Sequence, residues 1–442
     1  MSIIYNMVYI LSFLFAIPWL GIQAIRTGKY RQGWWQKLLG CVQQRYSQQP
    51  CVWFHAVSVG EVNLLTQIVH QWQQRHPDWD VAITSTTRTG FALAKQRFPG
   101  LLVDYYPLDF SWAVRRAMRR IRPHLLVMAE LELWPNFIGE AKRRGIPVAV
   151  INGRLSESSF RGYRRVGRLV QTWLRSIGWI GAQSETYRDR FVKLGARPQK
   201  VSCTGSLKFD RAEFDRENLQ TIRLKQLVGL KGNDPVWVVG STQDPEEAMA
   251  IRVYERLVRK YPNLKLIIVP RHAERFHEVM GMLRRTPIKS LQRSQLKTPI
   301  NEDWQVLLVD TIGELGAWWG AADIAFVGGS MGSRGGQNMI EPAAYGAAVC
   351  FGPNTRNFRD VVQRLLEREA AQVVESENDL FQFVSQSIQS PEGAAEMGQR
   401  AQELVRMQQG ATDRTLRGME QLLGENAIEM SASDQQDTVR AA

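Results

Sequence analysis

The sequence predicts an α/β protein with two doubly wound, Rossmann-like parallel sheets in series, preceded by an apolar N-terminal helix. Its 442 residues exceed what one hydrophobic core usually supports. Short apolar runs alternate with longer helical patterns, and the runs are continuous rather than alternating, which is typical of parallel strands covered on both faces. No charged residue occurs from Ser2 to Ile25. We therefore expect a helix followed by two tandem domains.

The N-terminal run is long enough to span a bilayer, because about 20 apolar residues cross the hydrocarbon core. No positive residue precedes it beyond the N-terminus itself, whereas Arg26, Lys29 and Arg31 follow. Positive flanks stay cytoplasmic, so residues 1–25 are predicted to be an uncleaved single-pass membrane anchor, with the body of the chain in the cytoplasm. Residues 26–50 would form a basic juxtamembrane segment. A helix lying on the membrane or on the protein is the alternative.

The first domain is predicted over residues 51–225 and the second over 226–423, followed by a disordered polar tail, 424–442. In the first domain, strands are expected at Val52–Ser58, Val81–Thr86, Leu101–Pro107, Leu125–Glu130, Pro147–Gly153, Ile177–Ser184 and Val201–Ser206. In the second they are expected at Val236–Thr242, Leu264–Pro270, Val306–Thr311, Ile324–Gly329, Ala347–Pro353 and Ala371–Glu375. Open parallel sheets bind ligands beyond the carboxyl ends of their strands, so the residues after each run are the candidates.

At the first junction, where the first predicted strand leads into a helix, the sequence has Ser58, Gly60 and Glu61. A carboxylate facing a cleft there can act as general base for a hydroxyl. It is equally explained by charge complementarity, because a helix N-terminus stabilises negative charge. Both interpretations remain open from the residues alone.

Hydroxyl, cationic and acidic groups gather at three further junctions of the first half. Thr87, Arg88 and Thr89 follow the second strand and suit an anion or sugar hydroxyls, or a simple N-cap. The fourth strand ends in Glu130-Leu-Glu132, which suits polyol binding or salt bridges with nearby arginines. The fifth is closed by Arg154 and Ser156.

The second half has a glycine-rich stretch from Gly328 to Pro342 after one of its strands. Glycines let the backbone approach a phosphate, and the following helix N-terminus favours its charge. Glu341 could accept hydrogen bonds from a ribose diol. The stretch is neither a GxGxxG fingerprint nor a P-loop. Two other strand ends carry further candidates: Ser241, and the triplet Pro270, Arg271 and His272.

The net charge of +13 lies in the first half, where 31 basic and 15 acidic residues occur between positions 1 and 220. Two arginine runs at helical spacing, 115–122 and 161–168, fit an anionic membrane surface, although the first could be a solvated face. No nucleic-acid-binding signature accompanies them, so nucleic acid is not expected. Asp78-Trp79-Asp80 precedes its strand, on the wrong side for the site, so a turn is favoured and neither metal nor cofactor is expected.

Seven segments, in order, resemble the Kdo transferase family, GT-B glycosyltransferases that attach 3-deoxy-D-manno-octulosonic acid (Kdo) to lipid A precursors. They are HAVSVGE, TSTTRTG, AELELWPN, INGRLS, GSLKFD, VPRHAERF and GGQNMIEPAAYG. The resemblance implies two domains with a deep cleft between them, CMP-Kdo as donor and substrate, and metal-independent inverting transfer to a lipid A precursor (lipid IVA) in lipopolysaccharide synthesis. It implies Glu61 as general base and Glu130 as a second catalytic acidic residue.

The remaining candidates divide between donor and acceptor; the resemblance implies the donor residues other than Ser241, and position after a predicted strand indicates Ser241 and the acceptor residues. Donor binding falls to Ser241, Pro270, Arg271, His272, Gly335, Gly336, Asn338 and Glu341. Acceptor binding falls to Ser58, Gly60, Thr87, Arg88, Thr89, Arg154 and Ser156. The chain departs from the family pattern at Gln337, at Asp244-Pro245 and within Arg31–Arg45. The alternatives are a GT-B transferase or epimerase that uses another activated sugar, and a membrane-tethered binding protein without activity.

Overall fold

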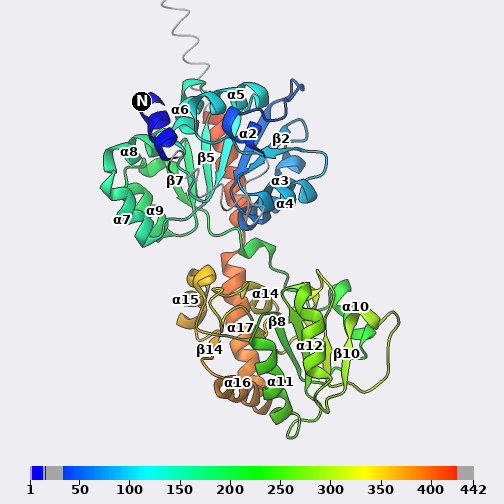
Figure 1. Cartoon of the computed structure of the whole chain (residues 1–442). Coiled ribbons are helices and arrows are strands. Elements are labelled where there is room, and N and C mark those ends of the chain that lie inside the picture. Colours follow the sequence, from blue (N-terminus) through cyan, green and yellow to red (C-terminus); the bar gives the residue numbers. More distant parts are fainter. Residues whose placement is uncertain (1, 13–14, 16–32, 426–442) are drawn as a thin grey trace, which may run out of the picture. The chain divides into compact units, whose positions relative to one another are not determined.

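The chain folds into two compact α/β units, each built on one seven-stranded parallel sheet (Figure 1). The computed structural model describes residues 2–12, 15 and 33–425. The prediction of two tandem doubly wound domains is therefore confirmed, and each unit is described by itself.

The sheet of the first unit has the strand order β3-β2-β1-β4-β5-β6-β7. Its strands are β1 (Cys51–Ala56), β2 (Asp80–Ser85), β3 (Leu102–Tyr105), β4 (Leu125–Ala129), β5 (Val148–Gly153), β6 (Trp179–Ala182) and β7 (Val201–Cys203). Every residue of β1 is buried. Val52 and Phe54 pack into one core cluster and Trp53 into another, because successive side chains point to opposite faces. Burial on both faces explains why the strands read as continuous apolar runs.

Helices cover both faces of this sheet. They are α2 (Trp34–Leu39), α3 (Val59–Arg75), α4 (Arg88–Arg97), α5 (Ser111–Ile121), α6 (Pro135–Arg143), α7 (Glu157–Arg165), α8 (Gly167–Arg175) and α9 (Glu185–Lys193). Helices α3, α4 and α9 each begin directly after a strand, with Ser58, Thr87 and Ser184 as N-caps. A serine or threonine hydroxyl at this position accepts a backbone N–H that the helix leaves unpaired.

The second unit has the strand order β10-β11-β9-β8-β12-β13-β14. Its strands are β8 (Val236–Thr242), β9 (Lys265–Pro270), β10 (Ser290–Gln292), β11 (Val306–Leu308), β12 (Ile324–Val327), β13 (Ala348–Phe351) and β14 (Gln372–Val373). Its helices are α10 (Leu219–Leu227), α11 (Glu246–Leu257), α12 (Phe276–Leu283), α13 (Leu315–Ala321), α14 (Ile340–Ala344), α15 (Arg359–Glu367), α16 (Glu377–Gln389) and α17 (Pro391–Gln408). The sequence did not predict β10, because this half-buried edge strand has only three residues, two of them polar.

The boundary between the units differs from the predicted one. The first unit ends at Asp210, and the chain returns to it after Gln408 (Figure 1). In the helix of residues 411–425, Leu416 and Met419 are fully buried in a core cluster of the first unit. The Asp210 carboxylate accepts the N–H groups of residues 411 and 412 at the start of this helix. The prediction that 226–423 is one domain is corrected, because periodicity shows that a helix is amphipathic but not which core it joins.

Leu416→Ala is expected to lower the free energy of unfolding of the first unit by about 2–5 kcal/mol, because the shorter side chain leaves a cavity in the core of that unit. Gln421→Ala, on the exposed side of the same helix, is the matched control. Chemical denaturation followed by hydrogen exchange of β1 measures the effect. Destabilisation confined to the second unit would contradict the assignment.

About half of the predicted membrane anchor, positions 1, 13–14 and 16–25, lies outside the described residues. Within the described part of the chain, no helix is both long and apolar enough to cross a bilayer. The anchor therefore stays a prediction. The described N-terminal portion, residues 2–12, is helical.

Two members of the first arginine run, Arg120 and Arg122, bind the chain before β1, whereas Arg115, Arg116 and Arg119 are exposed, so a membrane-facing role for this run stays a prediction. Arg120 donates from Nε to the carbonyl of Val42 at 2.5 Å, and Arg122 donates to the carbonyls of Arg45 and Ser47 at 3.1 and 2.8 Å. Arg45 itself is 7% exposed and donates to Asp80 at 2.7 Å. These cations hold the segment before β1 against the outside of α5. Charge alone could not separate this role from lipid binding.

Candidate active site

Glu61 lies in the first turn of α3, at the carboxyl end of β1, and is 8% exposed. One carboxylate oxygen accepts the backbone N–H of Val57 at 2.8 Å, and the other accepts the Ser58 hydroxyl at 2.9 Å. Burial raises the pKa of Glu61 despite these hydrogen bonds, and the nearby charge of Glu130 raises it further. The carboxylate is thus fixed in orientation and more basic than a free glutamate, which a general base requires.

Val57 connects this carboxylate to the next strand. Its carbonyl accepts the backbone N–H and the hydroxyl of Thr87 at 3.2 and 3.1 Å, and the hydroxyl of Ser85 at 3.1 Å. Thr87 also caps α4 by accepting the N–H of Gly90 at 3.1 Å. The first two junctions therefore form one hydrogen-bonded edge. Neighbouring Arg88 and Thr89 are exposed in the first turn of α4.

Two more carboxylates lie near Glu61, after β4. Glu130 adopts a left-handed backbone with φ 58°, a conformation that non-glycine residues rarely adopt and that is found at functional sites. Burial, followed by the charges of Glu61 and Glu130, raises the pKa of Glu132 to about 7. A dominant arginine partner would lower this pKa instead, so its direction argues against the salt-bridge interpretation for Glu132. Glu61, Glu130 and Glu132 thus form an acidic cluster at the carboxyl edge of the first sheet, and their negative charges repel one another.

His55 opens the first motif but takes no part in this chemistry. Its ring is fully buried, stacks on Tyr106 with 3.8 Å between ring centroids, and has Nδ1 3.1 Å from the carbonyl of Thr84. Burial lowers the pKa of His55 to about 3, so the ring is neutral at physiological pH. It is a packing residue between Thr84 and Tyr106.

The other predicted acceptor residues occupy the same edge with less direct links to Glu61. Gly60 is exposed in the first turn of α3, and Arg154 is half-buried after β5. Ser156 caps α7, where its hydroxyl accepts the N–H of Ser159 at 3.1 Å. Ser156 is thus an N-cap, and its role toward an acceptor stays a prediction.

In the second unit, a carboxylate organises the glycine-rich loop. Glu246 is 1% exposed at the start of α11. One of its oxygens accepts the N–H groups of Ser330 and Met331, each at 2.9 Å. The other accepts those of Gly329 at 2.7 Å and Gln243 at 3.0 Å. A Cβ on Gly328 would stand 2.7 Å from this carboxylate, so the glycine is needed for the close approach.

The adjacent Glu247 holds the loop after β9. It is fully buried and lies 3.0 Å from a guanidinium nitrogen of Arg275. Arg271 and His272, which precede Arg275 and follow the buried Pro270, are exposed. The pair Glu246–Glu247 therefore fixes two loops at once, one glycine-rich and one cationic.

The remaining predicted donor residues lie in α14, in the loop before it and at the end of β8. Asn338 donates to Glu341 at 2.9 Å. Burial raises the pKa of Glu341, while Asn338 and the charges of Arg211 and Arg271 lower it, which places both arginines near this carboxylate. Gly335 and Gly336 have φ 92° and 79°, so the loop needs glycine there. Ser241, at the end of β8, is also left-handed, with φ 55°.

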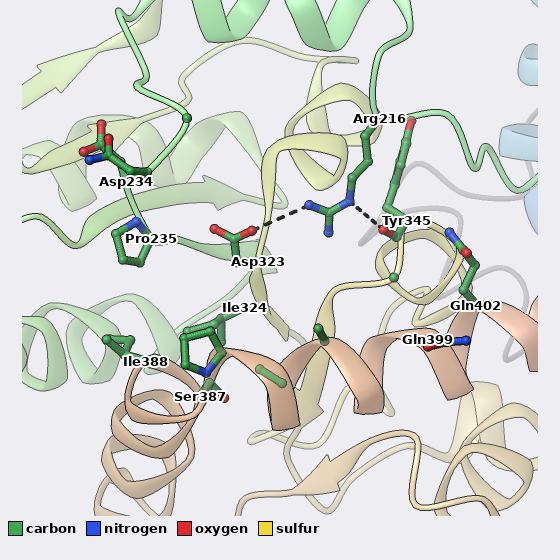
Figure 2. A pocket seen from close by; sticks show the side chains of 16 residues that line it. Arg216, Asp234, Pro235, Asp323, Ile324, Tyr345, Ser387, Ile388, Gln399 and Gln402 are labelled. Atoms are coloured by element: carbon green, nitrogen blue, oxygen red, sulfur yellow. Dashed lines mark hydrogen bonds and ion pairs between the residues drawn. The ribbon is translucent and has the colours of Figure 1, made fainter.

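Two cavities in the second unit lie at opposite edges of its sheet. One, of about 370 Å³, is lined by Glu246, His272, Arg275 and Arg334 together with the glycine-rich loop. The other, of about 570 Å³, lies where β8, β12 and β13 begin (Figure 2). Arg216 there already donates to the carbonyl of Tyr345 at 2.7 Å and lies 3.6 Å from Asp323. Since phosphates bind beyond carboxyl ends, the smaller cavity is the donor candidate.

The described residues contain no group of three His, Cys, Asp or Glu side chains arranged to hold a metal. Asp80, which could have belonged to a metal-binding pair, instead forms the 2.7 Å ion pair with Arg45. It starts β2, at the amino edge of the sheet, as the sequence indicated.

Sequence reasoning identified the junctions but not the groups that support them. The sequence around Glu246 and Glu247 indicates only the start of a helix. Two acidic residues shortly after a strand that ends in Gly-Ser-Thr can also accept the N–H groups of a neighbouring loop, and this is the signal that could have identified them. The sequence shows Glu132 at a strand end, but it does not show that the nearby charges of Glu61 and Glu130 raise the pKa of Glu132. Asp109, which is buried between β3 and α5, was missed because an aspartate after an apolar stretch is also typical of an exposed turn.

The chain is similar to known proteins over most of its length. A family model described as 3-deoxy-D-manno-octulosonic-acid transferase (kdotransferase) matches residues 32–211. The 3-deoxy-D-manno-octulosonic acid transferase of Haemophilus influenzae is 33% identical, over 90% of this chain and 93% of that protein. The crystal structure of a C-terminal CMP-Kdo binding domain from Acinetobacter baumannii is 28% identical, covering 42% of this chain and 96% of that one, with a TM-score of 0.40.

The fold is shared more widely. The UDP-GlcNAc 2-epimerase of Neisseria meningitidis, bound to UDP-GlcNAc, covers 86% of this chain and 100% of its own with a TM-score of 0.55. Its sequence identity is 12%, so this likeness concerns the fold alone.

Proposed function

Because the chain belongs to the Kdo transferase family, we propose that it transfers Kdo from CMP-Kdo to a hydroxyl of a lipid A precursor, lipid IVA, by an inverting, metal-independent displacement. The enzyme class, a glycosyltransferase of lipopolysaccharide synthesis, follows from family membership. The donor, the acceptor and the mechanism are the proposal. Glu61, a buried and oriented carboxylate of raised pKa, is the observation that carries it.

The reaction needs one proton acceptor. Glu61 takes the proton of the acceptor hydroxyl as that oxygen attacks the anomeric carbon of Kdo. The bond from this carbon to the phosphate oxygen breaks, and CMP leaves with the electron pair. Attack opposite to the leaving group inverts the anomeric centre. A base held by the N–H of Val57 and the hydroxyl of Ser58 needs no reorientation during the step.

The second unit is proposed to bind the donor and accept the departing charge. The exposed Arg271, and Arg275 and Arg334 at the smaller cavity, supply cations that suit a phosphate. Glu341, held by Asn338, suits a ribose diol. Fixed cations stabilise charge as it develops on the leaving phosphate, which is the role that a metal fills in other transferases.

The function is tested by incubating the purified full-length protein with CMP-Kdo and lipid IVA in detergent, and separating the products by mass. Addition of Kdo mass to the lipid with release of CMP supports the proposal. Well-folded protein that gives no Kdo product, or that uses a UDP-sugar instead, refutes it. The second outcome would favour the alternative of a GT-B enzyme with another donor.

The membrane surface that an insoluble acceptor requires is proposed to be contacted by α7 and α8. Arg164, Arg165 and Arg168 are exposed beside the exposed Val166 and Leu169. The sequence suggested one amphipathic helix here, but the chain breaks it at Val166 into two short helices. Exposed cations next to apolar side chains fit an anionic bilayer interface, the inner leaflet of the plasma membrane.

Arg165→Gln with Arg168→Gln is expected to weaken binding to anionic vesicles about 30-fold, because each cation contributes about 1 kcal/mol near such a surface. Sedimentation with vesicles of mixed zwitterionic and anionic lipid measures it. The loss should shrink at high salt. Arg284→Gln with Arg285→Gln removes two adjacent exposed cations from the second unit and is the control. Equal losses in both double variants would refute this surface.

A further inference from the structure

The N-terminal helix, residues 2–12, packs on the first unit through polar side chains on one face. Tyr5, Asn6 and Tyr9 lie at a spacing that places them on the same side of a helix. The ring of Tyr5 meets that of Trp173 edge-on at 6.0 Å, and its hydroxyl accepts the Trp173 indole N–H at 3.1 Å. The apolar remainder is exposed: Ile3, Ile4, Met7, Val8, Ile10 and Leu11. A segment selected only for hydrophobicity would not need these polar contacts.

Asn6 caps a helix from outside it. Its side-chain oxygen accepts the backbone N–H of Ser111 at 3.0 Å, and its amide donates to the Ser111 hydroxyl at 2.8 Å. Ser111 begins α5, and the N-cap residue of that helix, Phe110, has no side-chain oxygen to offer. The Asn6 oxygen also accepts the side-chain amide of Asn136, near the start of α6, at 3.3 Å.

Tyr9 reaches the start of α6 through Asp109. Its hydroxyl donates to one Asp109 oxygen at 3.0 Å. That carboxylate accepts the N–H of Asn136 at 2.9 Å and the N–H of Phe137 at 2.8 Å. The N-cap of α6, Trp134, makes no side-chain cap of its own. Burial raises the pKa of Asp109 to about 7, and its hydrogen bonds, including that from Tyr9, favour the charged form.

Helix α6 starts directly after the acidic loop that contains Glu130 and Glu132. That loop is held at one end by β4, and at the other by Asn136 and Phe137. We propose that Asn6 and Tyr9 are positioning residues for the acceptor half of the site, acting through Asp109 and the start of α6 on the carboxylates beside Glu61. This rests on the proposed function. It assigns the N-terminal helix a role in transfer that is separate from membrane attachment.

The test compares full-length wild type with Tyr9→Phe and with Asn6→Leu in the detergent assay. Each variant is expected to lower kcat/KM for the lipid acceptor about tenfold, the usual effect of one lost hydrogen bond to a charged or capping group. The donor KM should stay unchanged, because the donor residues belong to the other unit. Tyr46→Phe, at an 80% exposed tyrosine, is the matched control.

Two further measurements separate positioning from other causes. Amide hydrogen exchange should accelerate in peptides covering 109–113 and 134–139 in both variants, whether or not the protein transfers Kdo. Binding to anionic vesicles should remain at the wild-type level, because the exposed apolar face is intact. Accelerated exchange with unchanged acceptor kcat/KM would overturn the proposal, and so would a donor KM that rises in parallel. If the wild type has no transfer activity, the proposed function is refuted instead. The exchange experiment then still decides whether Asn6 and Tyr9 hold the starts of α5 and α6.

Discussion

Glu61→Gln is expected to lower kcat for Kdo transfer by about 10²- to 10⁴-fold, the usual contribution of a positioned general base. The glutamine keeps the size of the side chain. Its carbonyl can still accept the N–H of Val57, and its amide can donate to the Ser58 hydroxyl, so the local structure should persist. What is lost is the ability to accept a proton. Single-turnover kinetics with saturating donor measure the chemical step.

The pH dependence gives this prediction a second signature. Wild-type activity should fall as the pH decreases, because a protonated Glu61 accepts no proton, and the fall should begin at a higher pH than for a free glutamate, because burial raises its pKa. For stability the sign is reversed. A carboxyl whose pKa is higher in the folded state favours folding below its unfolded pKa, and that contribution is lost as the pH rises through the folded pKa. Glu61→Gln should therefore not lower the Tm at pH 7.

Glu185→Gln is the control for the loss of a carboxylate. Glu185 also lies in the first turn of a helix that follows a strand, but its side chain is 68% exposed and pairs with Arg188. It should transfer Kdo as the wild type does. If Glu61→Gln retained more than about a tenth of the wild-type kcat, general-base catalysis by Glu61 would be excluded.

Glu246→Gln is expected to destabilise the second unit by about 2–6 kcal/mol, because two buried N–H groups lose their acceptor at about 1–3 kcal/mol each. Each oxygen of Glu246 accepts two backbone N–H groups, so an amide nitrogen in either position faces two donors. The glycine-rich loop should then lose its fixed shape. The donor KM is expected to rise much more than the acceptor KM.

Thermal unfolding and steady-state kinetics with each substrate varied separately test this expectation. Glu255→Gln, at a half-buried site in the same helix, is the matched control and should change neither quantity. If Glu246→Gln had wild-type Tm and donor KM, the loop would not depend on this carboxylate. Equal increases in the KM of donor and acceptor would also contradict a role confined to the donor loop.

The sequence was sufficient for the strands of both sheets other than β10, because most of these strands are buried on both faces. Phe54 and Trp53 must both be apolar when each belongs to a core, and that requirement is visible as a continuous run. The strand ends follow from the same runs, so the sequence alone places Glu61, Glu130, Arg271 and Glu341 at a carboxyl edge. Their proposed chemical roles come from family resemblance, and the experiments above test them.

Long-range hydrogen bonding could not be predicted in the same way. Glu246 binds N–H groups more than 80 positions away, and Asn6 binds Ser111 across 105 positions. Such partners leave no periodic pattern, because a carboxylate or an amide can occupy a helix start for purely local reasons. The arginines of α5 were ambiguous for the same reason, since a cation that binds carbonyls and one that faces lipid look alike in one dimension.

The return of the chain to the first unit has a consequence for how the protein is made. The helix of residues 411–425 completes a core whose strands are all translated before the second unit, of about 200 residues, is made. At roughly 5–20 residues per second, this interval lasts roughly 10–40 seconds. During it, one face of the first sheet lacks its final cover, whereas the second unit is contiguous and has its complete sequence first. Chaperones and proteases should therefore act on the first unit of the nascent chain more than on the second. Loss of the last few dozen residues should destabilise the first unit, although these residues follow the second unit in the sequence.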